Sequence, residues 1–146
     1  MIWTNIIRRT QMKVLIVEDD FTARKLLQVF LREHADCEVA VNGKEAVQAF
    51  ADACDNDQPY DLICLDISMP EMDGQQALQE IRRLEEERDV AIGDGVKIVM
   101  TTAFGDKENV MTAFRVGCES YLVKPVSREK LFAELEKLGL LQTEVK

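Results

Sequence analysis

Six polar residues that can do chemistry each stand at the end of a short apolar run: Glu18, Asp19, Asp20, Asp66, Thr102 and Lys124. Clustered carboxylates repel one another, so a group of them calls for a cation. Ligand sets made only of oxygen favour Mg²⁺ over zinc or copper. A lysine adds a point charge suited to a phosphoryl oxygen, and a threonine adds a hydroxyl donor. Such a set is typical of metal-assisted phosphoryl transfer, in which an aspartate carboxylate can itself be the nucleophile and form an acyl phosphate.

These side chains can act together only if the apolar runs before them are strands of one sheet. Val14–Val17 and Leu62–Leu65 are continuously apolar, as in strands buried on both faces. Cys37–Val41 is shorter and partly polar, which is typical of an edge strand. Two further strands are predicted over residues 97–101 and 121–123.

Segments of helical period separate and follow these runs, each with apolar residues three or four positions apart on one face. The second predicted face consists of Ala46, Val47, Phe50, Ala51 and Cys54, and the fourth of Val110, Ala113, Phe114 and Gly117. Five strands alternating with five helices predict a (βα)5 chain, which is a doubly wound parallel sheet with right-handed crossovers and helices on both faces. Ligands of such sheets bind at the carboxyl ends of the strands, so the six polar residues are expected at one edge.

The ends of the helices carry signals of their own. Asp73 and Gln76 are spaced as an N-cap residue and its partner three positions on, close to a capping box. Asp20 is predicted to stabilise the start of the helix that follows it rather than to bind metal. The acidic run Glu85–Glu87 is interpreted as a solvated helix end, and Arg88–Val96 as a loop with no assigned role.

Composition excludes several classes of protein. The chain has 146 residues, 47% hydrophobic and 31% charged, which is the balance of one globular domain. A net charge of −9 argues against direct nucleic-acid binding, and no apolar run is long enough for membrane insertion. Four cysteines without a Cys-x-x-Cys pair, and a single histidine, argue against a zinc site. Free thiols of this kind predict a cytoplasmic location.

Four motifs in order resemble the receiver domain of two-component response regulators, most closely the stand-alone CheY-like type: Glu18-Asp19-Asp20, Asp66 to Gly74, Thr102-Ala103 and Tyr121 to Pro125. The resemblance covers residues 12 to about 138. It implies a flavodoxin-like sheet with the strand order 2-1-3-4-5, an order that the pattern of apolar runs does not give by itself. The expected domains are an N-terminal extension over 1–11, a receiver domain over 12–140 and a short tail over 141–146, with no output domain.

The resemblance also implies roles for residues at the strand ends. Asp66 is the implied phosphoacceptor. The implied Mg²⁺ ligands are Glu18, Asp19, Asp66 and the backbone carbonyl of Ser68. Lys124 would contact the phosphoryl group, and its peptide bond to Pro125 would be cis, a form that costs little before proline.

Further implied roles concern switching. Thr102 and Tyr121 are the implied switch pair, in which the hydroxyl moves to the phosphoryl oxygen and the aromatic ring turns inward. Ser68 and Phe104 hold the positions that tune autodephosphorylation in this family. We predict that Phe104 hinders the attacking water and lengthens the phosphorylated lifetime, so Phe104→Glu should change the decay rate. The implied output face covers roughly residues 107–138.

The function implied is a single-domain response regulator that takes a phosphoryl group from a sensor histidine kinase or a histidine phosphotransfer protein and then controls a protein target. It would not be an enzyme, because it would catalyse only its own aspartyl phosphorylation and dephosphorylation. Homodimer formation is left open by the sequence.

Two other functions place similar chemistry on a similar sheet. A phosphatase of the haloacid dehalogenase type expects a second aspartate two residues after the nucleophile, where this chain has Ser68. A flavodoxin-type FMN carrier expects a Ser/Thr/Gly-rich phosphate loop after the first strand, where this chain has three acids. A P-loop over Asn42–Glu45 fails as well, because the upstream glycine and the hydroxyl residue after the lysine are missing.

Overall fold

The computed structural model describes residues 11–69, 71–103 and 105–142. Within these residues five strands and five helices alternate: β1 (Met12–Val17), α2 (Phe21–Leu31), β2 (Ala35–Ala40), α3 (Gly43–Asp55), β3 (Leu62–Asp66), α4 (Gly74–Glu87), β4 (Lys97–Thr102), α5 (Lys107–Val116), β5 (Ser120–Val123) and α6 (Arg128–Lys137). The predicted (βα)5 chain is confirmed. The predicted N-terminal extension lies outside the described residues except for Gln11, and the predicted tail lies outside them from 143 onward.

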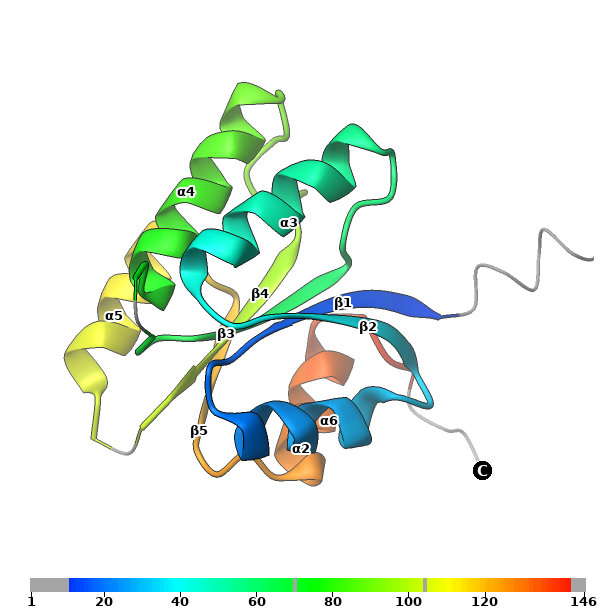
Figure 1. The fold of residues 1–146 in the computed structure, drawn as a ribbon, viewed down its shortest axis with the longest axis vertical. Coiled ribbons are helices and arrows are strands. Elements are labelled where there is room, and N and C mark those ends of the chain that lie inside the picture. The colour runs from blue at the N-terminus through cyan, green and yellow to red at the C-terminus, as the bar shows by residue number, and fades with distance from the viewer. Residues whose placement is uncertain (1–10, 70, 104, 143–146) are drawn as a thin grey trace, which may run out of the picture.

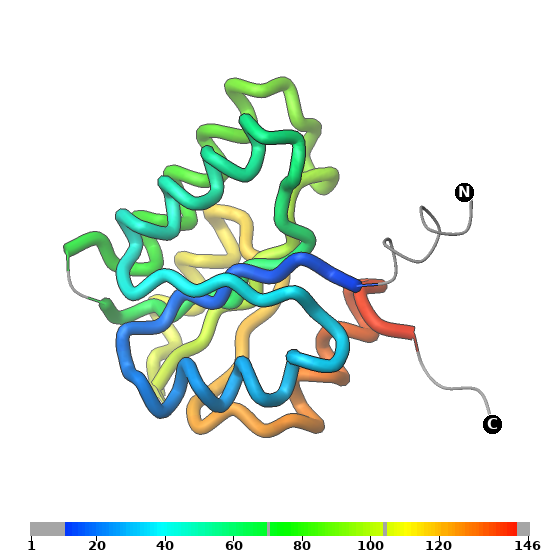
Figure 2. Tube along the Cα trace, turned by 45° about the vertical axis from the view of Figure 1, so that its right-hand side comes forward, coloured from blue at the N-terminus to red at the C-terminus, as the bar shows by residue number. Residues whose placement is uncertain are grey.

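All strand pairs in the described part of the chain are parallel, and the sheet has the order β2-β1-β3-β4-β5. The implied strand order is therefore correct. β1 and β3 lie in the interior of the sheet, which explains why their sequences are apolar throughout, whereas β2 is an edge and carries exposed residues. The chain begins and ends its described part on the same side of the molecule (Figures 1 and 2).

Helices cover the sheet on both faces (Figure 1). One hydrophobic cluster packs α3, α4 and α5 against the sheet and contains Leu65, Ile81 and Met100. The other packs α2 and α6 and contains Ile16, Leu27 and Leu131. Side chains of each interior strand enter the two clusters alternately, so the strands are held from both sides. Among the described residues no helix is long and apolar enough to cross a membrane.

Two of the described helices begin where their capping residues predict. The Asp73 carboxylate accepts from the backbone N–H of Gln76, whose side chain accepts from the backbone N–H of Asp73, so the capping box is complete. Asp20 accepts from the backbone N–H of Ala23 at 2.8 Å, which confirms that it stabilises the start of α2.

Three details of the sequence interpretation were wrong. Ala53 rather than Ala51 completes the buried face of α3, because the helix turns that position toward the sheet. Phe114 is exposed, since α5 buries only its Val110 and Ala113 side. Glu85 is buried rather than solvated: its carboxylate accepts from the backbone N–H of Val96 at 2.7 Å and pairs with a neighbouring arginine.

Candidate functional site

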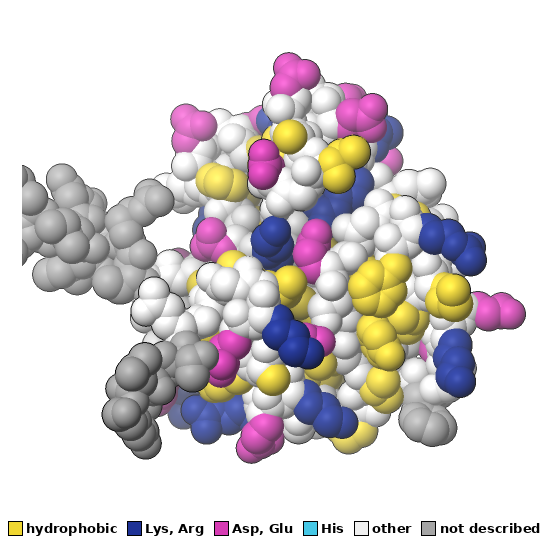
Figure 3. Space-filling model, turned by 180° about the vertical axis from the view of Figure 1, so that it is seen from behind, with side chains coloured by type: hydrophobic (Ala, Val, Ile, Leu, Met, Phe, Trp, Pro, Cys, Tyr) yellow, Lys and Arg dark blue, Asp and Glu magenta, His cyan; other side chains and the backbone are white. Residues whose placement is uncertain are grey.

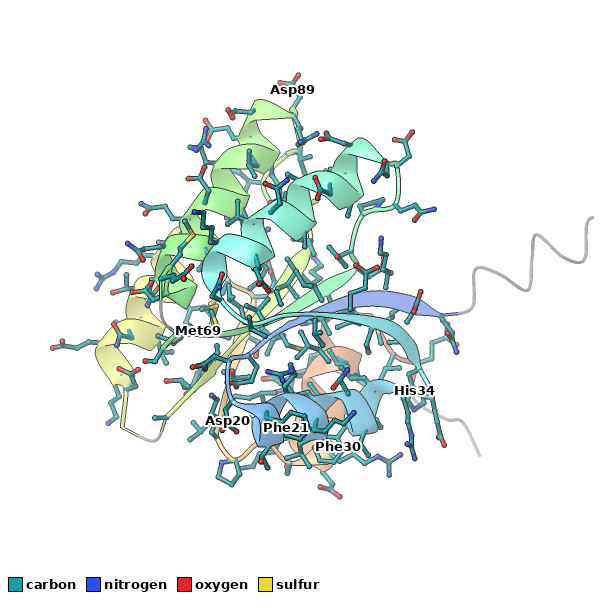
Figure 4. All side chains as sticks on the ribbon, viewed as in Figure 1. Asp20, Phe21, Phe30, His34, Met69 and Asp89 are labelled. Atoms are coloured by element: carbon teal, nitrogen blue, oxygen red, sulfur yellow. The ribbon has the colours of Figure 1, made fainter. Side chains whose placement is uncertain are left out.

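The candidate site lies where four neighbouring strands end on one edge of the sheet. Glu18 follows β1, Asp66 ends β3, Thr102 ends β4, and Lys124 follows β5. Figure 4 shows this edge at the point where Asp20 leads into α2, with the β3–α4 loop residue Met69 on the same side. His34 lies at the far end of α2 (Figure 4), and its ring packs edge-on against Phe132.

One lysine, Lys124, forms ion pairs with two buried carboxylates. The Lys124 ammonium lies 2.7 Å from Oε1 of Glu18 and 3.0 Å from Oδ2 of Asp66. Only 1% of Glu18 and 3% of Asp66 is exposed. The peptide bond between Lys124 and Pro125 is cis. The backbone N–H of Lys124 donates to the carbonyl of Thr102, which ties the start of this loop to β4.

The positive charge does not fully compensate the acids. Burial raises the pKa of the Glu18 carboxyl, and the adjacent Asp66 raises it further, although the Lys124 ammonium acts in the opposite direction. Burial acts to lower the pKa of Lys124, but its hydrogen bonds to the two carboxylates outweigh burial, and the pKa stands above its usual value. The buried site therefore favours one more positive charge.

A cation fits the arrangement of the acids. Carboxylate oxygens of Glu18, Asp19 and Asp66 lie within 4.8 Å of one another, and Asp19 is exposed to solvent beside the two buried acids. An all-oxygen set that is open on one side suits Mg²⁺, which keeps several water ligands. Of the four predicted metal ligands, the structure brings these three carboxylates together.

The end of β3 is held by its backbone and by the start of α4. The backbone N–H of Ser68 donates to Oδ1 of Asp66 at 3.2 Å, so Ser68 orients the carboxylate. Gly74 packs so closely that a Cβ there would lie 2.1 Å from the Asp66 carbonyl oxygen. Sequence reasoning missed this role of Gly74, although a glycine at the first position of a predicted helix is a signal of close approach.

The two predicted switch residues each contact a different neighbour on the β4–α5–β5 side of the site. Thr102 is buried, and its hydroxyl donates to Oδ2 of Asp106 at 3.2 Å. Tyr121 is 42% exposed, and its ring packs edge-on against Phe114 with centroids 6.0 Å apart. Asp106 was missed from the sequence. Phe104, predicted to tune dephosphorylation, lies outside the described residues.

A pocket of about 280 Å³ opens next to the carboxylates. Its walls come from the start of α2 and from the loop after β5, and its lining includes Glu18, Ala23, Lys124 and Pro125. The pocket therefore reaches Glu18 and Lys124 from the side of α2.

The profile of the response regulator receiver domain matches residues 14–136. The chain belongs to this family. The chemotaxis protein CheY of Listeria monocytogenes is 34% identical to this receiver domain over 129 residues, which cover 86% of this chain and 97% of that protein. The transcriptional regulatory protein ResD of Bacillus subtilis is 33% identical over 127 residues, which cover 86% of this chain and 47% of ResD.

A solved structure gives the same result. The CheX–CheY–BeF3–Mg²⁺ complex from Borrelia burgdorferi matches with a TM-score of 0.74 and 28% identity, covering 92% of this chain and 94% of that one. The receiver domain spans about half the length of ResD and nearly the whole length of the listerial chemotaxis protein. Membership of this family makes the chain a signalling module of two-component systems. Neither chemotaxis nor the transcriptional control of ResD is assigned to it on this basis.

Proposed function

We propose that this receiver domain accepts a phosphoryl group on Asp66 in a Mg²⁺-dependent reaction and then changes its affinity for a protein target. The observation that carries the proposal is the shared lysine: Lys124 lies 3.0 Å from the carboxylate of Asp66, inside a cluster with Glu18 and Asp19. We take residues 12–140 as the unit that does this, in the cytoplasm. The phosphodonor is a sensor histidine kinase or a histidine phosphotransfer protein.

Asp66 is the nucleophile of the proposed reaction. One of its carboxylate oxygens forms a bond to phosphorus while the bond from phosphorus to a donor imidazole nitrogen breaks. The imidazole leaves with the electron pair of that bond and becomes neutral by taking a proton from solvent. The Ser68 N–H holds one carboxylate oxygen of Asp66 in place during this exchange.

The other residues neutralise and bind the new group. Lys124 already contacts the reactive carboxylate, so its ammonium is within reach of a phosphoryl oxygen there. Glu18, Asp19, Asp66 and the Ser68 carbonyl would hold Mg²⁺, which supplies charge neutralisation of the phosphoryl oxygens. The Borrelia CheY was solved in a complex with BeF3 and Mg²⁺, which supports the assignment of a Mg²⁺ site to this receiver domain. Thr102 supplies a hydroxyl donor to the phosphoryl group.

The target is proposed to bind at α5, β5 and α6. Exposed apolar side chains stand on this face, among them Met111, Phe114 and Tyr121. The view from behind shows hydrophobic side chains gathered between lysines and arginines (Figure 3), as in many surfaces that bind protein partners. The turning of Tyr121 away from solvent would alter this face.

Intact mass after incubation with acetyl phosphate and Mg²⁺ tests the chemistry. We expect one added phosphoryl group in the native chain, none in Asp66→Ala, and none when the metal is chelated. Asp89→Ala, which removes an acid at the far tip of α4 (Figure 4), is the matched control and should be labelled like the native chain. An adduct that persists in Asp66→Ala would refute the assignment. If Mg²⁺ binds but no donor labels the protein, including kinases, a phosphorylation-independent interaction module becomes the better interpretation.

A further inference from the structure

The start of α5 differs from the starts of the other helices described. Elsewhere the N-cap side chain accepts a hydrogen bond from the backbone N–H three residues on, as in the pairs Asp20–Ala23, Asn42–Glu45, Asp73–Gln76 and Ser127–Lys130. At α5 the N-cap residue is Asp106, a residue type that normally caps well. Its side chain makes no such bond to the described backbone of α5.

The backbone at Asp106 explains the missing cap. Its ψ is 53°, whereas ψ at the four capping residues lies between 121° and 172°, in the extended region that capping requires. Asp106 can cap α5 only if this dihedral angle changes. Such a change would move the start of α5 relative to the end of β4.

The Asp106 carboxylate is instead occupied by side chains. Its Oδ2 accepts from the hydroxyl of Thr102 at 3.2 Å, and its Oδ1 accepts from the side chain of Asn109 at 2.7 Å. The Asn109 carbonyl in turn accepts from the side chain of Gln75 on α4. The hydroxyl of Thr102 also lies 3.3 Å from the carbonyl of Ala103. These contacts connect the hydroxyl at the candidate site to α5 and, through it, to α4.

A threonine hydroxyl has a single proton to donate. While Thr102 donates it to Asp106, it cannot donate it to a group bound at Asp66. An ionised carboxylate is a strong hydrogen-bond acceptor, so Asp106 should keep the Thr102 proton until a stronger acceptor lies within reach. A phosphoryl group beside Lys124 would be such an acceptor.

From this we propose that Asp106 is a positioning residue that holds the Thr102 hydroxyl away from Asp66 in the unphosphorylated protein, and that is released to cap α5 when Thr102 turns to the phosphoryl group. This inference rests on the proposed function and adds a residue to it. The proposed exchange couples the site to the target-binding face. Thr102 exchanges one hydrogen bond at the site, and α5, which belongs to that face, gains a cap at its start.

The first experiment measures rate constants with acetyl phosphate and Mg²⁺. Asp106→Ala removes the competing acceptor, so phosphorylation should become about threefold to tenfold faster. The dephosphorylation rate constant should stay within about twofold, because the Thr102–Asp106 bond is already broken in the phosphorylated protein and the cap that α5 then loses does not contact the phosphoryl group. Glu108→Ala removes an exposed carboxylate from the first turn of the same helix and should change neither rate. An equal acceleration in Glu108→Ala would mean a general charge effect and would overturn the proposal.

The dependence on Thr102 is decisive for mechanism. In a Thr102→Val background, which lacks the hydroxyl, Asp106→Ala should no longer accelerate phosphorylation. If the acceleration persists there, Asp106 acts by another route and the positioning role is wrong. A faster decay in Asp106→Ala would likewise count against it, since a loosened loop admits water.

A second experiment needs no phosphodonor. The methyl resonance of Thr102, observed by NMR in the free protein, should shift in Asp106→Ala and stay unchanged in Glu108→Ala. An unchanged resonance in Asp106→Ala would refute the inference even if Asp66 is phosphorylated. A shifted resonance in a protein that no donor labels would support the contact while refuting the proposed function.

Discussion

Among the single residues of the site, Lys124 supplies the positive charge that partly neutralises the buried carboxylates of Glu18 and Asp66. Lys124→Met would leave Glu18 and Asp66 buried without their shared cation. Removing one partner of a buried ion pair lowers the free energy of unfolding strongly. The loss should be smaller here, because 28% of the Lys124 side chain is exposed. We expect the free energy of unfolding at neutral pH, without Mg²⁺, to fall by about 1–3 kcal/mol in urea denaturation followed by circular dichroism.

The matched control is Lys137→Met. Lys137 pairs with Glu134 at 3.6 Å and its side chain is 75% exposed, so its loss should change the unfolding free energy by less than about 0.5 kcal/mol. Equal effects of the two substitutions would show that Lys124 behaves as an ordinary surface lysine. Mg²⁺ should recover part of the loss in Lys124→Met, because a bound cation stabilises only the folded protein.

The residues at strand ends could be predicted because their positions depend on the sheet alone. Apolar runs place Glu18 and Asp66 at one edge, whichever way the loops fold. Asp106 could not be found in this way, because its contact with Thr102 depends on the path of the loop after β4. Glu85 was misread for a related reason. Its contact with the Val96 N–H, which buries the carboxylate, forms only through the fold of residues 88–96, although its pairing with Arg82 has ordinary helical spacing.

At the scale of elements, Arg82 joins α4 to the starts of two strands. Its guanidinium donates to the carbonyls of Val96, before β4, and Gly117, before β5, each at 2.9 Å. It also pairs with Glu85 at 2.6 Å and with Glu119 at 2.8 Å. Only 18% of the Arg82 side chain is exposed. This one side chain therefore fixes α4 against the end of the sheet opposite the candidate site.

We expect Arg82→Met to lower the free energy of unfolding by about 2–4 kcal/mol, because it removes the cation that pairs with two carboxylates and the donor to two carbonyls. Arg83→Met is the neighbouring control. Among the described residues Arg83 pairs within its own helix, with Glu80 and Glu87, and its side chain is 54% exposed, so its loss should lower the unfolding free energy far less than the loss of Arg82. Urea unfolding curves of the two variants decide this, and a larger loss in Arg83→Met would contradict the assigned role of Arg82.

The strands were predictable because burial on one or both faces determines how apolar a strand must be. Continuous apolar runs gave the interior strands, and partial polarity gave β2 as an edge, since only interior strands are covered on both faces. The burial of a helix face was less predictable. Phe114 has the spacing of a core residue, yet α5 buries only its Val110 and Ala113 side and leaves Phe114 exposed beside Tyr121. Strand order came from the family resemblance and not from periodicity.

The whole molecule brings the site together from distant parts of the chain. Glu18, Asp66 and Lys124 are brought within contact distance only because β1 and β3 pair and the chain crosses over twice more to reach β5. Stability of the complete sheet is therefore a condition of function. Conditions that loosen the core should disrupt the candidate site before they remove secondary structure.

Buried thiols make that stability sensitive to alkaline pH. Burial raises the pKa of Cys118 to about 11 and that of Cys64 to about 12, both from an ordinary value of 9.0. The folded protein therefore keeps protons that the unfolded chain releases, so the free energy of unfolding falls as pH rises above the unfolded value and goes on falling until the folded values are passed. Each buried thiol should contribute a loss of about 1 kcal/mol between about pH 8 and about pH 10. Burial and the hydrogen bond to Glu38 also raise the pKa of Tyr60, which adds to the loss at still higher pH.

Urea unfolding between about pH 8 and about pH 10 measures how steeply the unfolding free energy falls with pH. A variant with Cys64→Ala and Cys118→Ala separates these two thiols from the other groups, which include Cys37, whose pKa burial also raises to about 11. The double variant starts from a lower stability because two small cavities are created in the core. Its unfolding free energy should nevertheless fall less steeply with pH than that of the native chain. Parallel slopes would mean that these thiols titrate alike in the folded and unfolded protein, which would contradict their burial in the two hydrophobic clusters. A shallower slope would show that proton release from the two hydrophobic clusters limits the pH range in which the receiver domain stays folded.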